Sequence, residues 1–259
     1  MSRLEWLTSE TERIGPHTIP RAAGLPHQGN NPSGIRRDSP AKHLAKRVLW
    51  PFRSAYHSLL VDGFVERTVG AWIRRLATDD TAFLEVGCGD MSLRRFLPPG
   101  VCYNAFDLSL SAFQLLRVLG RERRPMNIAL ASACAIPLDS ETASMIVSTE
   151  VLEHIPDVDA AVREIHRVAR PGARFICSIP NNLGHKYKSG RHPEHVNDWT
   201  FDQFQEYMAG HGFRCEERLM KGYWVPVHLP FVRAPIQLPV SSKREYENTN
   251  FFYLFQVEK

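Results

Sequence analysis

A glycine-bounded turn and an acidic residue are the first groups in this sequence with the types and spacing for binding chemistry. Gly87-Cys88-Gly89 directly follows an apolar run, and Asp107 follows the apolar run Cys102–Phe106, 22 residues after Glu85. Glycine lets the backbone turn sharply and approach a ligand closely, because no side chain occupies the ligand's space. A carboxylate at the end of the next strand accepts two hydrogen bonds from ribose hydroxyls. The pair indicates a nucleotide site with Leu108 against the adenine ring, although a glycine-rich turn without a ligand has the same composition.

A second set of polar residues has the spacing of a helical turn. Glu150, Glu153 and His154 stand at i, i+3 and i+4, so one turn would place them on the same side. They follow the apolar run Met145–Ser148, at the edge where open α/β sheets bind ligands. Two carboxylates and a neutral imidazole suit Mg²⁺, Mn²⁺ or Zn²⁺. Acidic residues are also common at helix N-termini, and a histidine there is often a packing residue, so the spacing alone leaves both interpretations open.

The elements that must position these residues follow from hydrophobic periodicity. Short apolar runs alternate with helical stretches from Thr81 onward, which is typical of a parallel, doubly wound α/β sheet. The residues from Val158 to Val168 predict a helix that ends before Pro171-Gly172. The predicted strands are Ala82–Val86, Cys102–Phe106, Asn127–Ala131, Met145–Ser148 and Arg174–Ile179.

The C-terminal part predicts one helix and two further strands. Thr200-Phe201-Asp202-Gln203 has the pattern of a capping box, and the helix it opens would end near Gly210. Phe213–Met220 and Asn250–Val257 would then pair antiparallel. The stretch 221–247 between them is rich in proline and aromatic residues and is expected to be an insertion near the active site.

The N-terminal part divides into an expected arm and an expected cap. Glycine and proline recur between Gly15 and Pro40 and large apolar residues are few, so residues 1–40 are expected to be a flexible arm that is dispensable for folding. From Ala41 onward the apolar residues have helical spacing, which predicts an N-terminal helical cap over residues 41–80. Residues 81–259 would form the main domain.

Composition favours a soluble protein of the reducing cytoplasm. No uninterrupted apolar run approaches the ~20 residues that span a bilayer, and the N-terminus lacks the apolar core of a signal peptide. The five cysteines are odd in number and have no paired metal spacing. The net charge is +4, and basic residues gather between Arg36 and Arg53, where they would meet an anionic surface or solvent.

The order of the motifs resembles the class I S-adenosylmethionine-dependent methyltransferase family, especially its small-molecule O-methyltransferases. The resemblance covers about residues 80–215 and also rests on Ala135–Asp139, Glu150–Asp157, Arg163–Gly172 and Ser178–Asn181. It implies a Rossmann-like sheet of about seven strands, mostly parallel with a C-terminal antiparallel hairpin, and S-adenosylmethionine as the cofactor. The cofactor-binding residues that it implies are Glu85, Gly87, Gly89, Asp107, Leu108, Ser132 and Ala133.

Three positions depart from the family pattern. Met91 stands where the family has a third glycine, Ser132 where it has an acid that faces adenine, and Ser144-Met145 where it has Phe-Asp. The first two departures affect the affinity and pose of the cofactor, because a missing acceptor leaves the adenine amino group to water or backbone. Asp107, the main ribose anchor, is retained.

The acidic segment and a remote histidine segment carry a second resemblance. Together they resemble ubiquinone-pathway catechol O-methyltransferases and the enzymes that 2′-O-methylate the 3′ ends of small RNAs. In the RNA enzymes a Glu-x-x-Glu-His segment and a distant histidine hold a metal, which implies Mg²⁺, Mn²⁺ or Zn²⁺ on Glu150, Glu153, His154 and His195. Without a metal, the candidate general bases are His154, His192 and His195.

The resulting hypothesis is an O-methyltransferase that acts on a hydroxylated small molecule such as a sugar, phenol or natural product. An RNA 2′-O-methyltransferase is an alternative, although the sequence shows no separate RNA-binding module. A methyltransferase-like binding module without catalysis is a third hypothesis, motivated by Met91, Ser132 and Met145. The sequence names neither the acceptor nor the oligomeric state.

Overall fold

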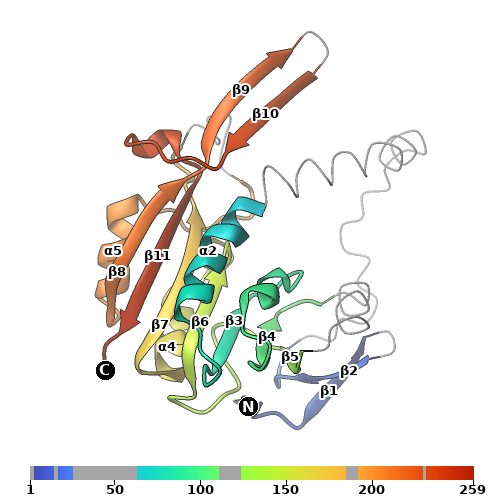
Figure 1. The fold of residues 1–259 in the computed structure, drawn as a ribbon. Coiled ribbons are helices and arrows are strands. Elements are labelled where there is room, and N and C mark those ends of the chain that lie inside the picture. The colour runs from blue at the N-terminus through green and yellow to red at the C-terminus, as the bar shows by residue number, and fades with distance from the viewer. Residues whose placement is uncertain (1–2, 15–16, 26–62, 111–123, 185–191, 230–231) are drawn as a thin grey trace, which may run out of the picture.

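The computed structural model describes residues 3–14, 17–25, 63–110, 124–184, 192–229 and 232–259 (Figure 1). Residues 26–62, which include the basic cluster and much of the expected arm and cap, lie outside the described residues. The strands are β1 (Glu10–Ile14), β2 (His17–Arg21), β3 (Phe83–Val86), β4 (Tyr103–Asp107), β5 (Met126–Leu130), β6 (Ala143–Thr149), β7 (Ala169–Pro180), β8 (Phe213–Lys221), β9 (Tyr223–Leu229), β10 (Val232–Leu238) and β11 (Asn250–Val257).

The helices of the described residues are few and surround the sheet. The α-helices are α2 (Gly63–Leu76), α4 (Val158–Val168) and α5 (Phe201–Ala209), and the short 3-10 helices are η2 (Ser92–Phe96), η3 (Leu152–His154) and η5 (Glu245–Glu247). The predicted capping box is confirmed: Thr200 Oγ1 accepts from Gln203 N, and Gln203 Oε1 accepts from Thr200 N.

One sheet of nine strands has the order β1-β2-β5-β4-β3-β6-β7-β11-β8. The strands β5, β4, β3, β6 and β7 pair parallel, whereas β11 pairs antiparallel with both β7 and β8. The predicted Rossmann-like sheet, mostly parallel with an antiparallel C-terminal pair, is therefore confirmed, and two N-terminal strands extend it. Because the five parallel strands point the same way, the residues that follow them meet at one edge.

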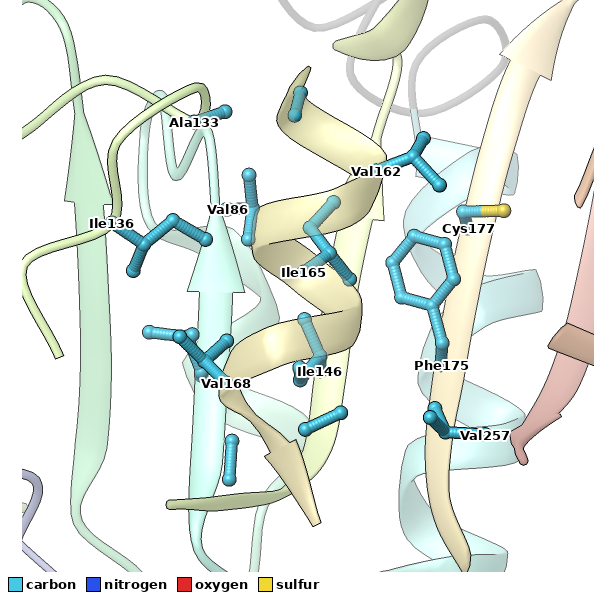
Figure 2. Close-up of a cluster of buried hydrophobic side chains, with 14 of the residues drawn as sticks. Val86, Ala133, Ile136, Ile146, Val162, Ile165, Val168, Phe175, Cys177 and Val257 are labelled. Atoms are coloured by element: carbon cyan, nitrogen blue, oxygen red, sulfur yellow. The ribbon is translucent and has the colours of Figure 1, made fainter. Parts of the chain in front are cut away.

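Alternate residues of the central strands pack into two separate cores. Leu84, Ile146 and Phe175 belong to the core that α4 and α5 cover, which Figure 2 shows around Val162, Ile165 and Val168 of α4. The intervening residues face the second core, beneath α2 and η2, with buried side chains that include Phe83, Tyr103, Val147 and Ile176. Burial on both faces explains why these strands have continuous apolar runs instead of alternating polarity.

Helix α2 belongs to the expected helical cap, and its interior glycine has a packing role. The Phe96 ring of η2 lies so close to Gly70 that a Cβ there would be 2.5 Å from the ring. Four apolar residues of α2 that have helical spacing are buried, namely Phe64, Val69, Trp72 and Ile73. The glycine that weakens the helical pattern thus permits close contact between two elements on the same face of the sheet.

The N-terminal segment differs from the expected flexible arm. The strands β1 and β2 pair antiparallel, and β2 joins the edge strand β5 through the pair Arg21–Leu130. Buried asparagines hold the segment before it: Leu4 N donates to Asn104 Oδ1 at 3.0 Å, and Asn127 Nδ2 donates to Leu4 O at 2.6 Å. Composition did not predict the structure of residues 3–14 and 17–25, because a few buried side chains and pairing with a strand edge suffice to order them.

The predicted insertion at 221–247 contains the antiparallel hairpin β9–β10, which forms its own two-stranded sheet. Figure 1 shows this hairpin extending away from the nine-stranded sheet. Its position over an active site stays a prediction.

The N-terminal segment gives the first testable prediction. Leu4→Ala should lower the free energy of unfolding by about 2–5 kcal/mol, because the Leu4 side chain is 6% exposed and packs in the core with Phe106. Leu7→Ala is the matched control, since Leu7 is 55% exposed and should change stability by less than about 0.5 kcal/mol. Urea unfolding of both variants provides the measurement. Equal stabilities would show that the segment does not contribute to the fold.

Candidate functional site

A cavity of about 470 Å³ lies at the carboxyl ends of β3, β4, β5 and β6. Most of its lining atoms are apolar, and its polar groups come from the ends of different strands. The lining residues are Gly87, Gly89, Phe106, Asp107, Leu108, Ala131, Ser132, Ala133, Cys134, Thr149, Glu150, Val151, His154, Ile155 and Pro156. Six of the seven residues predicted for cofactor binding are in this lining, and Glu85 is not.

The glycine turn after β3 has the backbone conformation that its sequence predicts. Gly87 has φ +72° and Gly89 has φ +45°. A Cβ at Gly87 would lie 2.5 Å from Val151 Cγ2, whereas a Cβ at Gly89 would meet no atom within 4 Å and would occupy open space. Met91, which replaces the third glycine, also has a left-handed backbone (φ 59°) and is fully buried. The turn therefore keeps its shape without the third glycine.

Asp107 is fixed by two backbone amides. Gly89 N donates to its Oδ2 at 2.9 Å, and Ser109 N donates to its Oδ1 at 3.0 Å. Each carboxylate oxygen has a further lone pair, so the group can accept from two neighbouring hydroxyls in the cavity. Leu108, beside it, is 60% exposed although it is apolar, which suits a side chain that a flat ring would cover.

Ser132 and Ala133 form the turn that follows β5. Ser132 pairs with Ala135 in an isolated bridge, and Cys134 N donates to Ser132 Oγ at 3.2 Å. The serine hydroxyl thus takes part in its own turn, and the backbone and Ala133 supply the neighbouring cavity wall.

Glu85 lies beneath the turn. It is 2% exposed, and Tyr103 Oη donates to its Oε2 at 2.5 Å. Burial raises the pKa of Glu85 to about 8, with smaller increases from Asp90, Glu66 and Asp107, while the Tyr103 hydrogen bond opposes them. Glu85 is therefore mostly protonated at neutral pH, and it supports the turn from the core.

The acidic segment separates into two parts. Glu150 has φ +53° and η3 is a single 3-10 turn, so Glu150 is out of phase with Glu153 and His154. Its carboxylate accepts from Ser178 Oγ at 2.7 Å and from Asn250 Nδ2 at 2.8 Å. The expected single turn with all three side chains on one side is not formed.

Three of the four predicted metal ligands do converge. Potential ligand atoms of Glu153, His154 and His195 all lie within 4.8 Å of one another, and among the described residues they form a group with the composition of a metal site. His154 Nε2 lies 3.7 Å from Glu153 Oε1, and the two histidine rings are 4.8 Å apart. Glu153 and His195 are buried, whereas His154 reaches the cavity.

Neighbouring oxygens orient both histidines of this cluster. His154 Nδ1 lies 3.0 Å from Glu194 O, and His195 Nδ1 lies 2.6 Å from Asn182 Oδ1. A carbonyl oxygen only accepts, so each Nδ1 carries a proton, and in the neutral imidazole the lone pair is then on Nε2. The amide orientation of Asn182 is set by its Nδ2, which donates to Asp198 Oδ1 at 2.6 Å.

His192 has the opposite tautomer. Glu194 N lies 3.4 Å from His192 Nδ1 and donates to it, so the His192 proton belongs on Nε2. The His192 and His195 rings are 4.5 Å apart, which places His192 beside the cluster. Among the three predicted bases, only His154 lines the cavity.

Sequence reasoning missed the residues that orient the others. Asn182, Ser178 and Asn250 have no periodic pattern, and Asn250 lies 100 residues from the carboxylate to which it donates. The position of Asn182 just beyond the predicted strand Arg174–Ile179 is a signal that could have identified it, because that end of the strand lies at the ligand edge. Asn250 offers no such signal.

Comparisons with known proteins agree with this geometry. Residues 84–177 match the family described as "Methyltransferase domain". A Mycolicibacterium smegmatis protein named "Probable S-adenosylmethionine-dependent methyltransferase" is 28% identical over 140 residues, which are 52% of this chain and 53% of that protein. A ubiquinone biosynthesis O-methyltransferase of Parvibaculum lavamentivorans is 26% identical over 154 residues, which are 54% of this chain and 61% of that protein. The chain thus matches between half and two thirds of the length of these relatives.

A solved structure has the same fold. It is the 1,6-didemethyltoxoflavin-N1-methyltransferase of Burkholderia thailandensis with bound 1,6-didemethyltoxoflavin and S-adenosylhomocysteine. The TM-score is 0.55 at 15% identity, with 97% of this chain and 100% of that chain covered. At this identity the likeness concerns the fold alone. None of the helices that the structure describes is both long and apolar enough for a bilayer crossing.

The buried acid beneath the turn gives a pH-dependent prediction. The ordinary pKa of Glu85 is 4.5 and its folded pKa is about 8, so between these values the unfolded chain loses a proton that the folded chain keeps. The Glu85 contribution to stability therefore falls as pH rises from about 4.5 to 8, by at most about 1.4 kcal/mol per unit. Glu85→Gln lacks this titration and should gain stability relative to the natural chain across that range.

Urea unfolding at pH 5, 6, 7 and 8 measures the difference. The free energy of unfolding of Glu85→Gln minus that of the natural chain should increase as pH rises from 5 to 8. Parallel pH dependences would show that Glu85 is ionised in the folded state.

Proposed function

We propose that this chain, which belongs to the class I S-adenosylmethionine-dependent methyltransferase family, transfers the methyl group of its cofactor to a hydroxyl oxygen of a small molecule. The observation that carries the proposal is that one cavity brings together the glycine turn, Asp107 and His154. The curated relative named as an O-methyltransferase supports oxygen as the acceptor atom.

The cavity suits S-adenosylmethionine in shape and chemistry. The space at Gly89, which a Cβ would fill, gives a ligand access to backbone amides. Asp107 would accept from the ribose hydroxyls, and Leu108 and Ala133 would contact the adenine ring. Gly87 would lie beside the amino acid part of the cofactor.

Without a metal, His154 is the best candidate for the general base. Glu194 O fixes its Nδ1 proton, which leaves Nε2 able to take the proton of an acceptor hydroxyl. Methyl transfer is a direct displacement, so the main contribution of the protein is to align the acceptor oxygen with the methyl carbon and the sulfur.

Glu153, His154 and His195 fit a divalent cation by their chemistry. One carboxylate and two imidazoles with oriented Nε2 atoms are typical ligands of Zn²⁺ or Mn²⁺. Both Nδ1 atoms donate to an oxygen, as histidines that bind a metal usually do, and this orients their rings. When bound, a cation would act as a Lewis acid that lowers the pKa of an acceptor hydroxyl. Acceptors with two neighbouring oxygens are then the first compounds to screen.

Cofactor binding gives the next prediction. Asp107→Ala should weaken binding of S-adenosylhomocysteine by about tenfold to more than a hundredfold, because a fixed charged acceptor is lost. Isothermal calorimetry provides the measurement. Asp139→Ala, which removes an exposed carboxylate outside the cavity, is the control and should bind normally. Unchanged binding by the Asp107 variant would refute the ribose assignment.

The metal proposal has a separate test. Calorimetric titration of the purified chain with Mn²⁺ or Zn²⁺ should show one site, and His195→Ala should weaken it at least tenfold. Asn182→Ala should weaken it about tenfold, because the orientation of His195 is lost. His211→Ala, which changes a histidine that contacts Tyr207 and Asp159, should bind like the natural chain. If the natural chain and the three variants bind the cation alike, or if none of them binds it, the metal proposal is wrong and His154 acts without a metal.

A further inference from the structure

Glu150 has a strained backbone at the rim of the cavity. Its φ of +53° is left-handed, which a residue with a side chain adopts at a cost of about 1–3 kcal/mol. The conformation is held by Glu150 N, which donates to Ser178 O at 3.0 Å. Glu150 lines the cavity between Thr149 and Val151. A conformation of this kind persists only where the surrounding structure fixes it, and such conformations are concentrated at functional sites.

The carboxylate of Glu150 is held by two donors from other strands. Ser178 Oγ and Asn250 Nδ2 lie 2.7 and 2.8 Å from its two oxygens, and both residues are at least 97% buried. Thr249 Oγ1 donates to Asn250 Oδ1 at 2.7 Å, which fixes the amide with its Nδ2 toward Glu150. Donors on both oxygens stabilise an anionic carboxylate in one position.

The strand order places this carboxylate at one end of the cofactor cavity. Ser132 follows β5, Asp107 ends β4, the glycine turn follows β3 and Glu150 follows β6, and these strands are neighbours in that order (Figure 1). The Glu150 side chain lies on the side of this row of strand ends that faces β7 and β11, where it accepts from Ser178 and Asn250. An extended nucleoside with adenine at Ser132 and ribose at Asp107 would thus have the group on its ribose 5′ carbon near the end where Glu150 lies.

In S-adenosylmethionine that group is a cationic sulfonium, and in the demethylated product it is a neutral thioether. A fixed anion in a largely apolar cavity distinguishes these two ligands by charge, since their shapes differ by one methyl group. We propose that Glu150 is the charge partner of the sulfonium, and that it makes the chain bind S-adenosylmethionine in preference to its product. Ser178 and Asn250 are positioning residues that act through Glu150. The inference rests on the proposed cofactor.

Selective recognition of the cation has a consequence for turnover. Once the methyl group has left, the sulfur is uncharged and the attraction to Glu150 is lost. Product release is thereby favoured, because the interaction contributes to binding of the substrate form alone.

The test compares three ligands by calorimetry on the natural chain and on Glu150→Gln, which removes the charge but keeps the shape. The ligands are S-adenosylmethionine, S-adenosylhomocysteine and sinefungin, in which a carbon that bears a protonated amine replaces the methylated sulfur. Glu150→Gln should weaken the two cationic ligands about tenfold or more and S-adenosylhomocysteine less than threefold. Glu141→Gln is the matched control, because Glu141 also has a left-handed backbone (φ 59°) but lies exposed and outside the cavity.

Each other outcome overturns the inference. Equal weakening of all three ligands would assign Glu150 to the amino acid part that they share, and no weakening would remove it from the cofactor site. If the natural chain binds none of the ligands, the proposed function fails as well. Thermal unfolding of each variant separates misfolding from lost recognition. Ser178→Ala, which keeps the charge, gives a second measurement and should lose part of the preference for the cationic ligands.

Discussion

The parallel pairing of β3 with β4 and β6 is the constraint on which the site depends. Val86 pairs with Phe106 and with Ser148, so the next residues of all three strands reach the sheet edge at the same level. Asp107 then lies where Gly89 N can donate to it, and Val151 lies against Gly87. A shift of one residue in either pairing would turn the side chains to the opposite faces and remove these contacts. The cavity is therefore a consequence of strand register.

Most of the central fold could be predicted because its signals are local. Continuous apolar runs identify strands buried on both faces, and Thr200 and Gln203 mark a helix start through hydrogen bonds within one turn. The same holds for Gly87, Gly89 and Asp107, whose types are dictated by the ends of two adjacent strands. Each of these residues makes its contacts with neighbours whose positions the sequence pattern also predicts.

The remaining features depend on contacts between distant residues. Leu4 is ordered by Asn104 and Asn127, which look like ordinary strand residues until the segment docks. Glu85 lies near the end of a strand like a ligand-binding acid, yet the side chain of Tyr103 from the adjacent strand retains it in the core. These partners lie far apart in the sequence or on adjacent strands. Residue type and spacing therefore cannot distinguish an acid that is buried in the core from an acid that faces the cavity.

The segment from Glu150 to His154 shows how one backbone angle divides a motif. With helical φ throughout, three polar side chains would share one side, and two carboxylates would repel each other without a cation. The left-handed conformation at Glu150 instead sends its carboxylate to Ser178 and Asn250, while Glu153 and His154 lie with His195. The two carboxyl groups are separated and each has its own set of neighbours. The short segment after β6 therefore contributes both to the cavity and to the group of Glu153, His154 and His195. The single turn η3 fixes the spacing between these two parts.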